Sequence, residues 1–172
     1  MPRLLGLVLA VLTNTAFAAP PISEQVLTAA YLYNFLKFTA WPEGNAVTEL
    51  TLCVTDSATF GQELDDISGR LAQNKPVRIR RIDLGESPSG CHLLFLPREE
   101  KPIRIREWLK NTENMTTLTV SNMSEFLDMG GMIALTDDGK RLQFAVQLER
   151  VKRVGLMLNA QLLQIAREVR GK

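Results

Sequence analysis

The chain has 172 residues, of which 20 are Lys or Arg and 19 are Asp or Glu, so its formal net charge is +1. This near balance speaks against a nucleic-acid partner, because nucleic-acid-binding proteins usually carry a basic excess on one face. Beyond a short N-terminal apolar stretch, no segment is apolar enough to suggest a membrane span.

The N-terminus has the pattern of a secretory signal peptide. Arg3 supplies a positive charge, residues 4–12 form an apolar run, and Ala16-Phe17-Ala18 is a small-x-small cleavage site. The apolar run is shorter than the about 20 residues that a membrane-spanning helix needs, so we expect cleavage after Ala18 and not a retained anchor. The sequence therefore predicts a signal peptide at residues 1–18 and one exported domain at residues 19–172, an ordinary length for a single domain.

Apolar periodicity and breaker residues predict alternating helices and strands. Ser23 is a candidate N-cap for a first helix that runs to about Thr39. Further helices are expected at residues 57–69, 101–110, 123–129 and 149–169, and strands at 49–55, 76–82, 91–96, 117–121, 132–136 and 141–147.

This alternation predicts an α/β fold: a three-layer sandwich of flavodoxin-like character, with a mostly parallel sheet and helices on both faces. The turn at residues 137–140 indicates that the last expected strand returns antiparallel, as a C-terminal hairpin partner. The strand at 91–96 is nearly all apolar, so we expect it at the centre of the sheet.

Aromatic side chains are concentrated in residues 31–41, at the end of the first helix and just beyond it. Helical apolar spacing usually means packing, so most of this stripe is expected in the core. Part of it could instead form a partner-binding patch, for which Tyr31, Trp41 and Pro42 are the candidates. Trp41 is the expected exposed anchor, because tryptophan is enriched in interface hot spots.

Arg78 and Arg80 alternate with apolar residues along the strand at 76–82. Their guanidinium groups could bind an anionic ligand or partner. They could equally protect a sheet edge from unwanted pairing. Both readings stay open, and both residues are candidate partner-binding residues.

The sequence offers no catalytic constellation. His92 is the single histidine and lies in an apolar strand, where a structural role is the usual one. No nucleophile elbow, P-loop or dinucleotide-binding glycine motif is present. Glu63, Asp65 and Asp66 are expected on a solvated helix face. We therefore expect no enzyme activity, no cofactor and no metal.

The two cysteines, Cys53 and Cys91, leave two alternatives open. An even number of cysteines in an exported chain favours a disulfide. Two free buried cysteines are the other possibility. Both cysteines are expected on strands, and they can form a disulfide only if their Cα atoms lie within about 7 Å.

A second functional class is a periplasmic small-solute-binding module. In open α/β sheets, ligands bind at the carboxyl ends of the strands. Here these ends carry Asp56, Ser57, Pro97, Arg98 and Ser121.

Five sequence blocks together resemble the YfiR/HmsC-like periplasmic proteins over roughly residues 27–167. The blocks are, in order, residues 29–38 with Trp41-Pro42, Leu52-Cys53-Val54, residues 91–95, residues 130–133, and residues 141–144 with 155–163.

The resemblance implies a periplasmic repressor that binds the periplasmic sensor domain of an inner-membrane diguanylate cyclase. Such repression lowers cyclic di-GMP and restrains exopolysaccharide and biofilm formation. The resemblance also implies an outer-membrane OmpA-like lipoprotein as a second partner, a possible homodimer and a Cys53–Cys91 disulfide. The second cysteine pair of some relatives is missing from this sequence.

Overall fold

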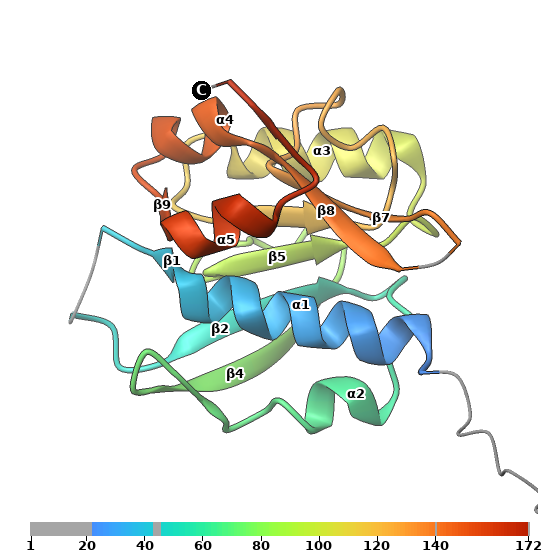
Figure 1. The fold of residues 1–172 in the computed structure, drawn as a ribbon. Coiled ribbons are helices and arrows are strands. Elements are labelled where there is room, and N and C mark those ends of the chain that lie inside the picture. The colour runs from blue at the N-terminus through green and yellow to red at the C-terminus, as the bar shows by residue number, and fades with distance from the viewer. Residues whose placement is uncertain (1–21, 43–45, 140, 172) are drawn as a thin grey trace, which may run out of the picture.

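The computed structural model describes residues 22–42, 46–139 and 141–171 (Figure 1). The expected signal peptide at residues 1–18 lies outside this range. No helix in the described part of the chain combines the length and the apolar character needed to cross a membrane.

Within the described residues, an eight-stranded sheet has the order β10-β8-β7-β6-β5-β2-β4-β3. Its strands are β2 (Leu50–Thr55), β3 (Leu71–Ala72), β4 (Lys75–Ile82), β5 (Leu93–Leu96), β6 (Leu118–Ser121), β7 (Ile133–Asp137), β8 (Leu142–Gln147) and β10 (Glu168–Arg170). Strands β4, β2, β5, β6 and β7 run parallel to their neighbours in that order, which is the flavodoxin-like order. Strand β8 is antiparallel to β7. The predicted sheet and its C-terminal hairpin are therefore confirmed.

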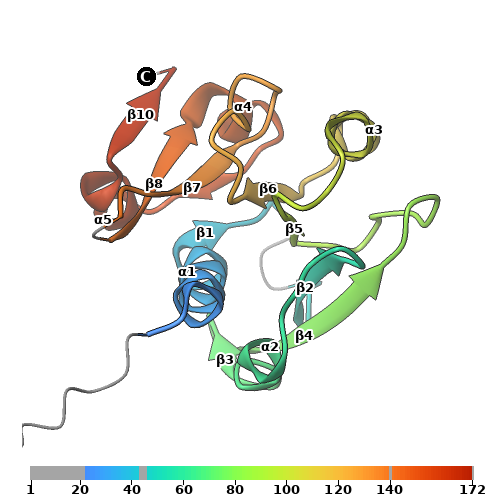
Figure 2. The ribbon, with the colours of Figure 1, turned by 90° about the vertical axis from the view of Figure 1, so that its right-hand side faces the viewer.

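Helices cover both faces of this sheet, as predicted (Figure 2). They are α1 (Glu24–Phe38), α2 (Gln62–Asp65), α3 (Pro102–Thr112), α4 (Leu148–Arg153) and α5 (Ala160–Ile165). Helices α1 and α5 lie on one side of the sheet and α3 on the other. The apolar core accordingly has two parts, one containing Leu36 and Phe95 and the other containing Leu94 and Trp108.

Helix α1 forms where the sequence predicts it. The Ser23 hydroxyl oxygen accepts a hydrogen bond from the Val26 backbone N–H at 3.2 Å, which caps the helix. The helix ends at Phe38 because the next two residues become a strand, β1 (Thr39–Ala40). Strand β1 pairs antiparallel with β9 (Met157–Leu158), with Thr39 opposite Leu158.

The predicted long helix at 149–169 is wrong. Helix α4 ends after Arg153, and Gly155 has a φ of 80°, a left-handed conformation that favours glycine and stops a helix. The chain then enters β9, and α5 starts anew after Asn159, whose side chain accepts a hydrogen bond from the Gln161 backbone N–H at 2.8 Å. Apolar residues are buried on both sides of the break, among them Val151 in α4, Leu156 after it and Leu162 in α5.

Of two shorter predicted helices, one is much shorter than predicted and the other does not form. The expected helix at 57–69 shrinks to α2, since the Ser57 hydroxyl bonds to the Glu100 carboxylate and does not cap a helix. Residues 124–130 form turns in place of the helix expected at 123–129. In these turns the backbone N–H of Gly131 donates to the Phe126 carbonyl at 2.9 Å.

Candidate functional site

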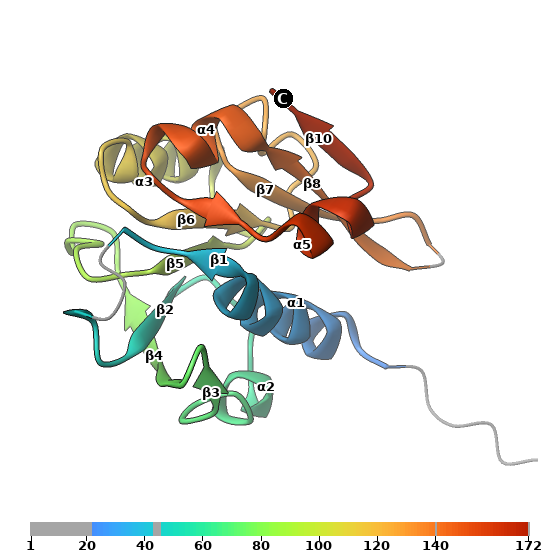
Figure 3. The same cartoon turned by 60° about the vertical axis from the view of Figure 1, so that its left-hand side comes forward.

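An apolar groove runs between α1 and α5, which lie side by side in Figures 1 and 3. Its cavity has a volume of about 190 Å³. We call it the α1–α5 groove; its lining residues are Tyr31, Asn34, Phe38, Gln161, Leu162 and Ile165. Of the candidate partner-binding residues predicted from the sequence, Tyr31 is the one that lines this groove.

Tyr31 is held rigidly on the α1 side of the groove. Its hydroxyl donates to the Leu142 carbonyl of β8 at 2.9 Å. Its ring contacts the rings of Phe35 and Phe144, with centroid distances of 5.9 and 5.7 Å. Because both the hydroxyl and the ring are fixed, Tyr31 gives the groove a preformed apolar wall.

Helix α5 forms the opposite wall. Leu162 is buried, whereas the side chain of Ile165 is 70% exposed. The wall is tied to α1 by the backbone N–H of Asn159, which donates to the Phe38 carbonyl at 2.8 Å. Sequence reasoning missed this wall because it assumed one continuous helix; Gly155 followed by Asn159, a helix stop and then a cap residue, was the available signal.

The surface beyond Phe38 is mixed, with polar as well as apolar side chains. A second cavity, of about 270 Å³, is lined by Phe38 together with Met157 and Leu158 of β9. Met157 is 67% exposed. Ile165 and Met157 line two cavities that share Phe38, and exposed apolar side chains of this kind are typical of a protein-interaction surface.

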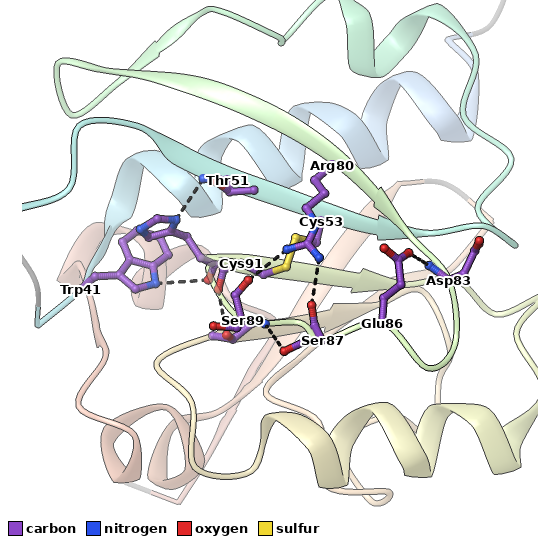
Figure 4. Close-up of a disulfide and its surroundings, with 11 residues drawn as sticks. Trp41, Thr51, Cys53, Arg80, Asp83, Glu86, Ser87, Ser89 and Cys91 are labelled. Carbon is purple, nitrogen blue, oxygen red and sulfur yellow. Dashed lines mark hydrogen bonds between the residues drawn. A yellow bond between two sulfur atoms is a disulfide. The ribbon is translucent and has the colours of Figure 1, made fainter.

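Trp41 is not exposed, so the expectation that it forms a surface anchor is wrong. It is 8% exposed, and its indole N–H donates to the His92 carbonyl at 3.2 Å (Figure 4). This hydrogen bond ties the segment after α1 to the chain entering β5. The neighbouring Pro42 is exposed, as expected.

The two arginines of β4 have different environments. Arg78 is exposed and pairs with Glu49 at 3.1 Å, an arrangement that contributes little to stability in solvent. Arg80 donates to the carbonyls of Ser87 and Ser89, both at 3.0 Å, and so fastens the loop before β5 (Figure 4). Neither residue contacts the α1–α5 groove.

The Cys53–Cys91 disulfide is present. Cys53 lies on β2, and Cys91 lies just before β5, so the bridge joins a strand to a loop and not two strand interiors. The Cα atoms are 5.7 Å apart, within the range of ordinary disulfides. The bridge and the Arg80 hydrogen bonds hold the same loop (Figure 4).

His92 has a structural role. Its Nδ1 accepts a hydrogen bond from the Thr51 backbone N–H at 3.0 Å, and its ring meets the edge of Trp41. The residue is 9% exposed. Among the described residues, no group of three or more His, Cys, Asp and Glu side chains is placed to hold a metal ion.

The carboxyl ends of β2 and β5, where a solute would bind in this fold, leave little space. The cavity there is about 30 Å³, far smaller than the roughly 300–1,000 Å³ of pockets for drug-sized ligands. Arg98 lines this cavity and donates a hydrogen bond to Glu24 at 2.7 Å, and this hydrogen bond raises the pKa of Arg98 above its ordinary value.

A second polar contact closes the same edge. The Glu100 carboxylate is buried, and it accepts from the Ser57 hydroxyl at 2.7 Å and pairs with the Arg104 guanidinium at 3.1 Å. Asp56, Ser57 and Arg98, which the sequence suggests for a solute cleft, are therefore each paired with side chains of the protein itself.

Comparison with known proteins identifies the family. A family model described as YfiR/HmsC-like matches residues 25–167. No curated protein sequence matches the chain.

Solved structures share the fold at low sequence identity. A conserved domain protein from Vibrio cholerae O1 biovar El Tor str. N16961 has a TM-score of 0.56 and 7% identity, covering 87% of this chain. The ABC domain in complex with L-Trp from Streptococcus pneumonia has a TM-score of 0.56 and 9% identity, covering 82% of this chain. The match spans 61% of each of those chains.

Proposed function

Because the chain belongs to the YfiR/HmsC-like family of periplasmic regulators of diguanylate cyclase signalling, we propose that it represses an inner-membrane diguanylate cyclase. It does so by binding the periplasmic sensor domain of that enzyme. Repression lowers cyclic di-GMP and with it exopolysaccharide production and biofilm formation. The proposal includes export by the signal peptide at residues 1–18 and action as a folded, non-catalytic protein in the periplasm.

The α1–α5 groove is the surface that we assign to the sensor domain. The observation that carries the assignment is the exposure of Ile165, at 70%, on the rim of a groove whose opposite wall, Tyr31, is rigidly held. A partner residue inserted there would bury apolar surface without ordering Tyr31, and preorganisation of this kind reduces the entropy cost of binding. In this proposal Tyr31 is the predicted residue that contacts the partner, while Trp41 and Arg80 hold the segment after α1 and the loop before β5 in place.

Repression through this surface requires a difference in affinity. The protein must bind the inactive sensor conformation more tightly than the active one, and each tenfold difference corresponds to about 1.4 kcal/mol. In this proposal an outer-membrane OmpA-like lipoprotein relieves repression by binding the protein in competition with the sensor domain. A homodimer through the same groove would compete in the same way.

The experiment measures binding of the purified sensor domain to two matched variants. Ile165→Asp places a charge on the groove rim, and Ile103→Asp places the same charge on α3, where Ile103 is 67% exposed and lies outside the groove. We expect Ile165→Asp to weaken sensor-domain binding by about tenfold or more, because burying a carboxylate in an apolar contact is costly. Ile103→Asp should bind as the wild type does.

Equal binding by both variants would reject the groove as the interface. Light scattering on the free protein tests whether the groove instead forms a homodimer. Such a dimer would dissociate in Ile165→Asp and persist in Ile103→Asp.

A further inference from the structure

A second, polar cavity lies between α3 and α4, which are neighbours in Figure 3. Its volume is about 200 Å³. It shares no lining residue with the α1–α5 groove. We call it the α3–α4 pocket; it is lined by Arg106, Lys110, Thr119, Gly130, Arg150 and Arg153, together with other residues of α3 and of the segments that follow α3, precede β7 and follow α4.

Positive charge dominates this pocket. Four basic side chains line it, and Glu113 is the one carboxylate among the lining residues that the structure describes. Arg153 pairs with Glu149 at 2.9 Å. Within the described part of the chain, Arg106, Lys110 and Arg150 form no ion pair. Cations gathered around one cavity repel each other, so the folded chain bears a cost there that an anion would relieve.

Arg150 is placed by a glycine. Gly130 has a φ of 108°, and a Cβ built on it would lie 3.4 Å from the Arg150 guanidinium. The absence of a side chain at this position lets the guanidinium lie close against the backbone of Gly130, which also lines the pocket. The planar guanidinium group can then present paired N–H donors to an oxyanion.

Thr119 adds a buried hydroxyl. It is 2% exposed, and its oxygen accepts from the Met132 backbone N–H at 3.2 Å. The hydroxyl proton has no acceptor among the described residues, so Thr119 can still donate one hydrogen bond. Thr119 is among the residues that line the pocket, which makes its hydroxyl a candidate donor to an anion bound there.

From these observations we infer that the α3–α4 pocket binds a small multivalent anion carrying a phosphate group. Several cations, guanidinium forks and a hydroxyl donor match the charge and the oxygens of phosphate. The pocket is smaller than the roughly 300–1,000 Å³ of pockets for drug-sized ligands, which suits phosphate with a short substituent. The inference does not depend on the proposed function.

The test is isothermal titration of the full mature chain with inorganic phosphate, at an ionic strength held constant with sodium chloride because screening weakens all charge pairs. We expect saturable binding by the wild type. The variant Arg106→Gln/Arg150→Gln should weaken it by about tenfold or more. Lys152→Gln is the control. It also removes a positive charge, from an exposed α4 residue that does not line the pocket, and should change the affinity for phosphate by less than about twofold.

A thermal melt of each variant without phosphate separates loss of binding from loss of folding. If the double variant does not fold, the single variant Arg106→Gln replaces it in the titration. Flotation with phosphatidic acid vesicles, against phosphatidylcholine vesicles, tells a lipid-borne phosphate from a free one. Pocket-dependent binding in either arm supports the inference. No saturable binding in both arms, or an equal loss in Lys152→Gln, would overturn it.

Discussion

The Tyr31 hydroxyl donates a hydrogen bond to the Leu142 carbonyl, across 111 residues of sequence, and thereby fixes α1 against the first residue of β8. Tyr31→Phe removes this hydrogen bond and leaves the ring on the groove wall. We expect the free energy of unfolding to fall by about 1 kcal/mol, a typical net value for one hydrogen bond, with sensor-domain affinity unchanged. Denaturant unfolding and binding titrations measure the two quantities.

Tyr33→Phe is the matched control for that change. Its hydroxyl donates to the Leu71 carbonyl at 2.7 Å in a more exposed setting and outside the groove. We expect a smaller loss of stability, because water can replace the partner. A loss of affinity in Tyr31→Phe as large as that in Ile165→Asp would mean that the hydroxyl itself contacts the partner, contrary to our assignment.

The disulfide is expected to stabilise the folded chain substantially. Cys53 and Cys91 are 38 residues apart, and closing a loop of this length contributes about 2–4 kcal/mol, chiefly by restricting the unfolded state. Cys53→Ala/Cys91→Ala should lose this amount in denaturant unfolding. Reductant should destabilise the wild type by a similar amount and leave the variant unchanged; a wild type that is indifferent to reduction would contradict this prediction.

Gly131 packs directly under a buried ring. A Cβ at this position would overlap the ring of Phe126, which is fully buried and cannot move outward. Gly131→Ala should therefore lower the free energy of unfolding by about 1–3 kcal/mol, the usual cost of overpacking. Ser124→Ala, at an exposed position of the same turn segment, is the control and should have little effect. Equal stability of the two variants would show that the ring can shift.

If the chain is exported as proposed, its mature N-terminus is predicted to be Ala19. Cleavage at the Ala16-Phe17-Ala18 site leaves Ala19 as the first residue. Intact-mass measurement of the protein from a periplasmic extract should give the mass of residues 19–172. The full-length mass in a membrane fraction would instead indicate a retained anchor.

The fold was predictable from the sequence where local signals agree with tertiary packing. Ser23 and the apolar spacing after it gave α1, and the continuous apolar run at Leu93–Leu96 gave a central strand, β5, which is buried throughout. In both places the local pattern and the final environment require the same side chains, so periodicity is sufficient.

The C-terminal third shows where periodicity fails. Apolar residues keep helical spacing from Val151 to Val169, yet pairing of β9 with β1 takes Met157 and Leu158 out of any helix. That pairing depends on residues more than a hundred positions away, which no local pattern reports. Trp41 is a second case, because its indole N–H donates to the carbonyl of His92, 51 positions away, and no local pattern reports that contact either. The α1–α5 groove follows from these long-range contacts, so only its Tyr31 side was predictable.

The repressor assignment is tested most directly by cellular cyclic di-GMP. The nucleotide is measured in a strain deleted for this chain and in one that also lacks the partner diguanylate cyclase, each complemented with wild type, Ile165→Asp or Ile103→Asp. We predict that deletion raises cyclic di-GMP only when the cyclase is present, and that wild type and Ile103→Asp restore the low level while Ile165→Asp does not. An unchanged level on deletion, with the cyclase expressed, would contradict repression.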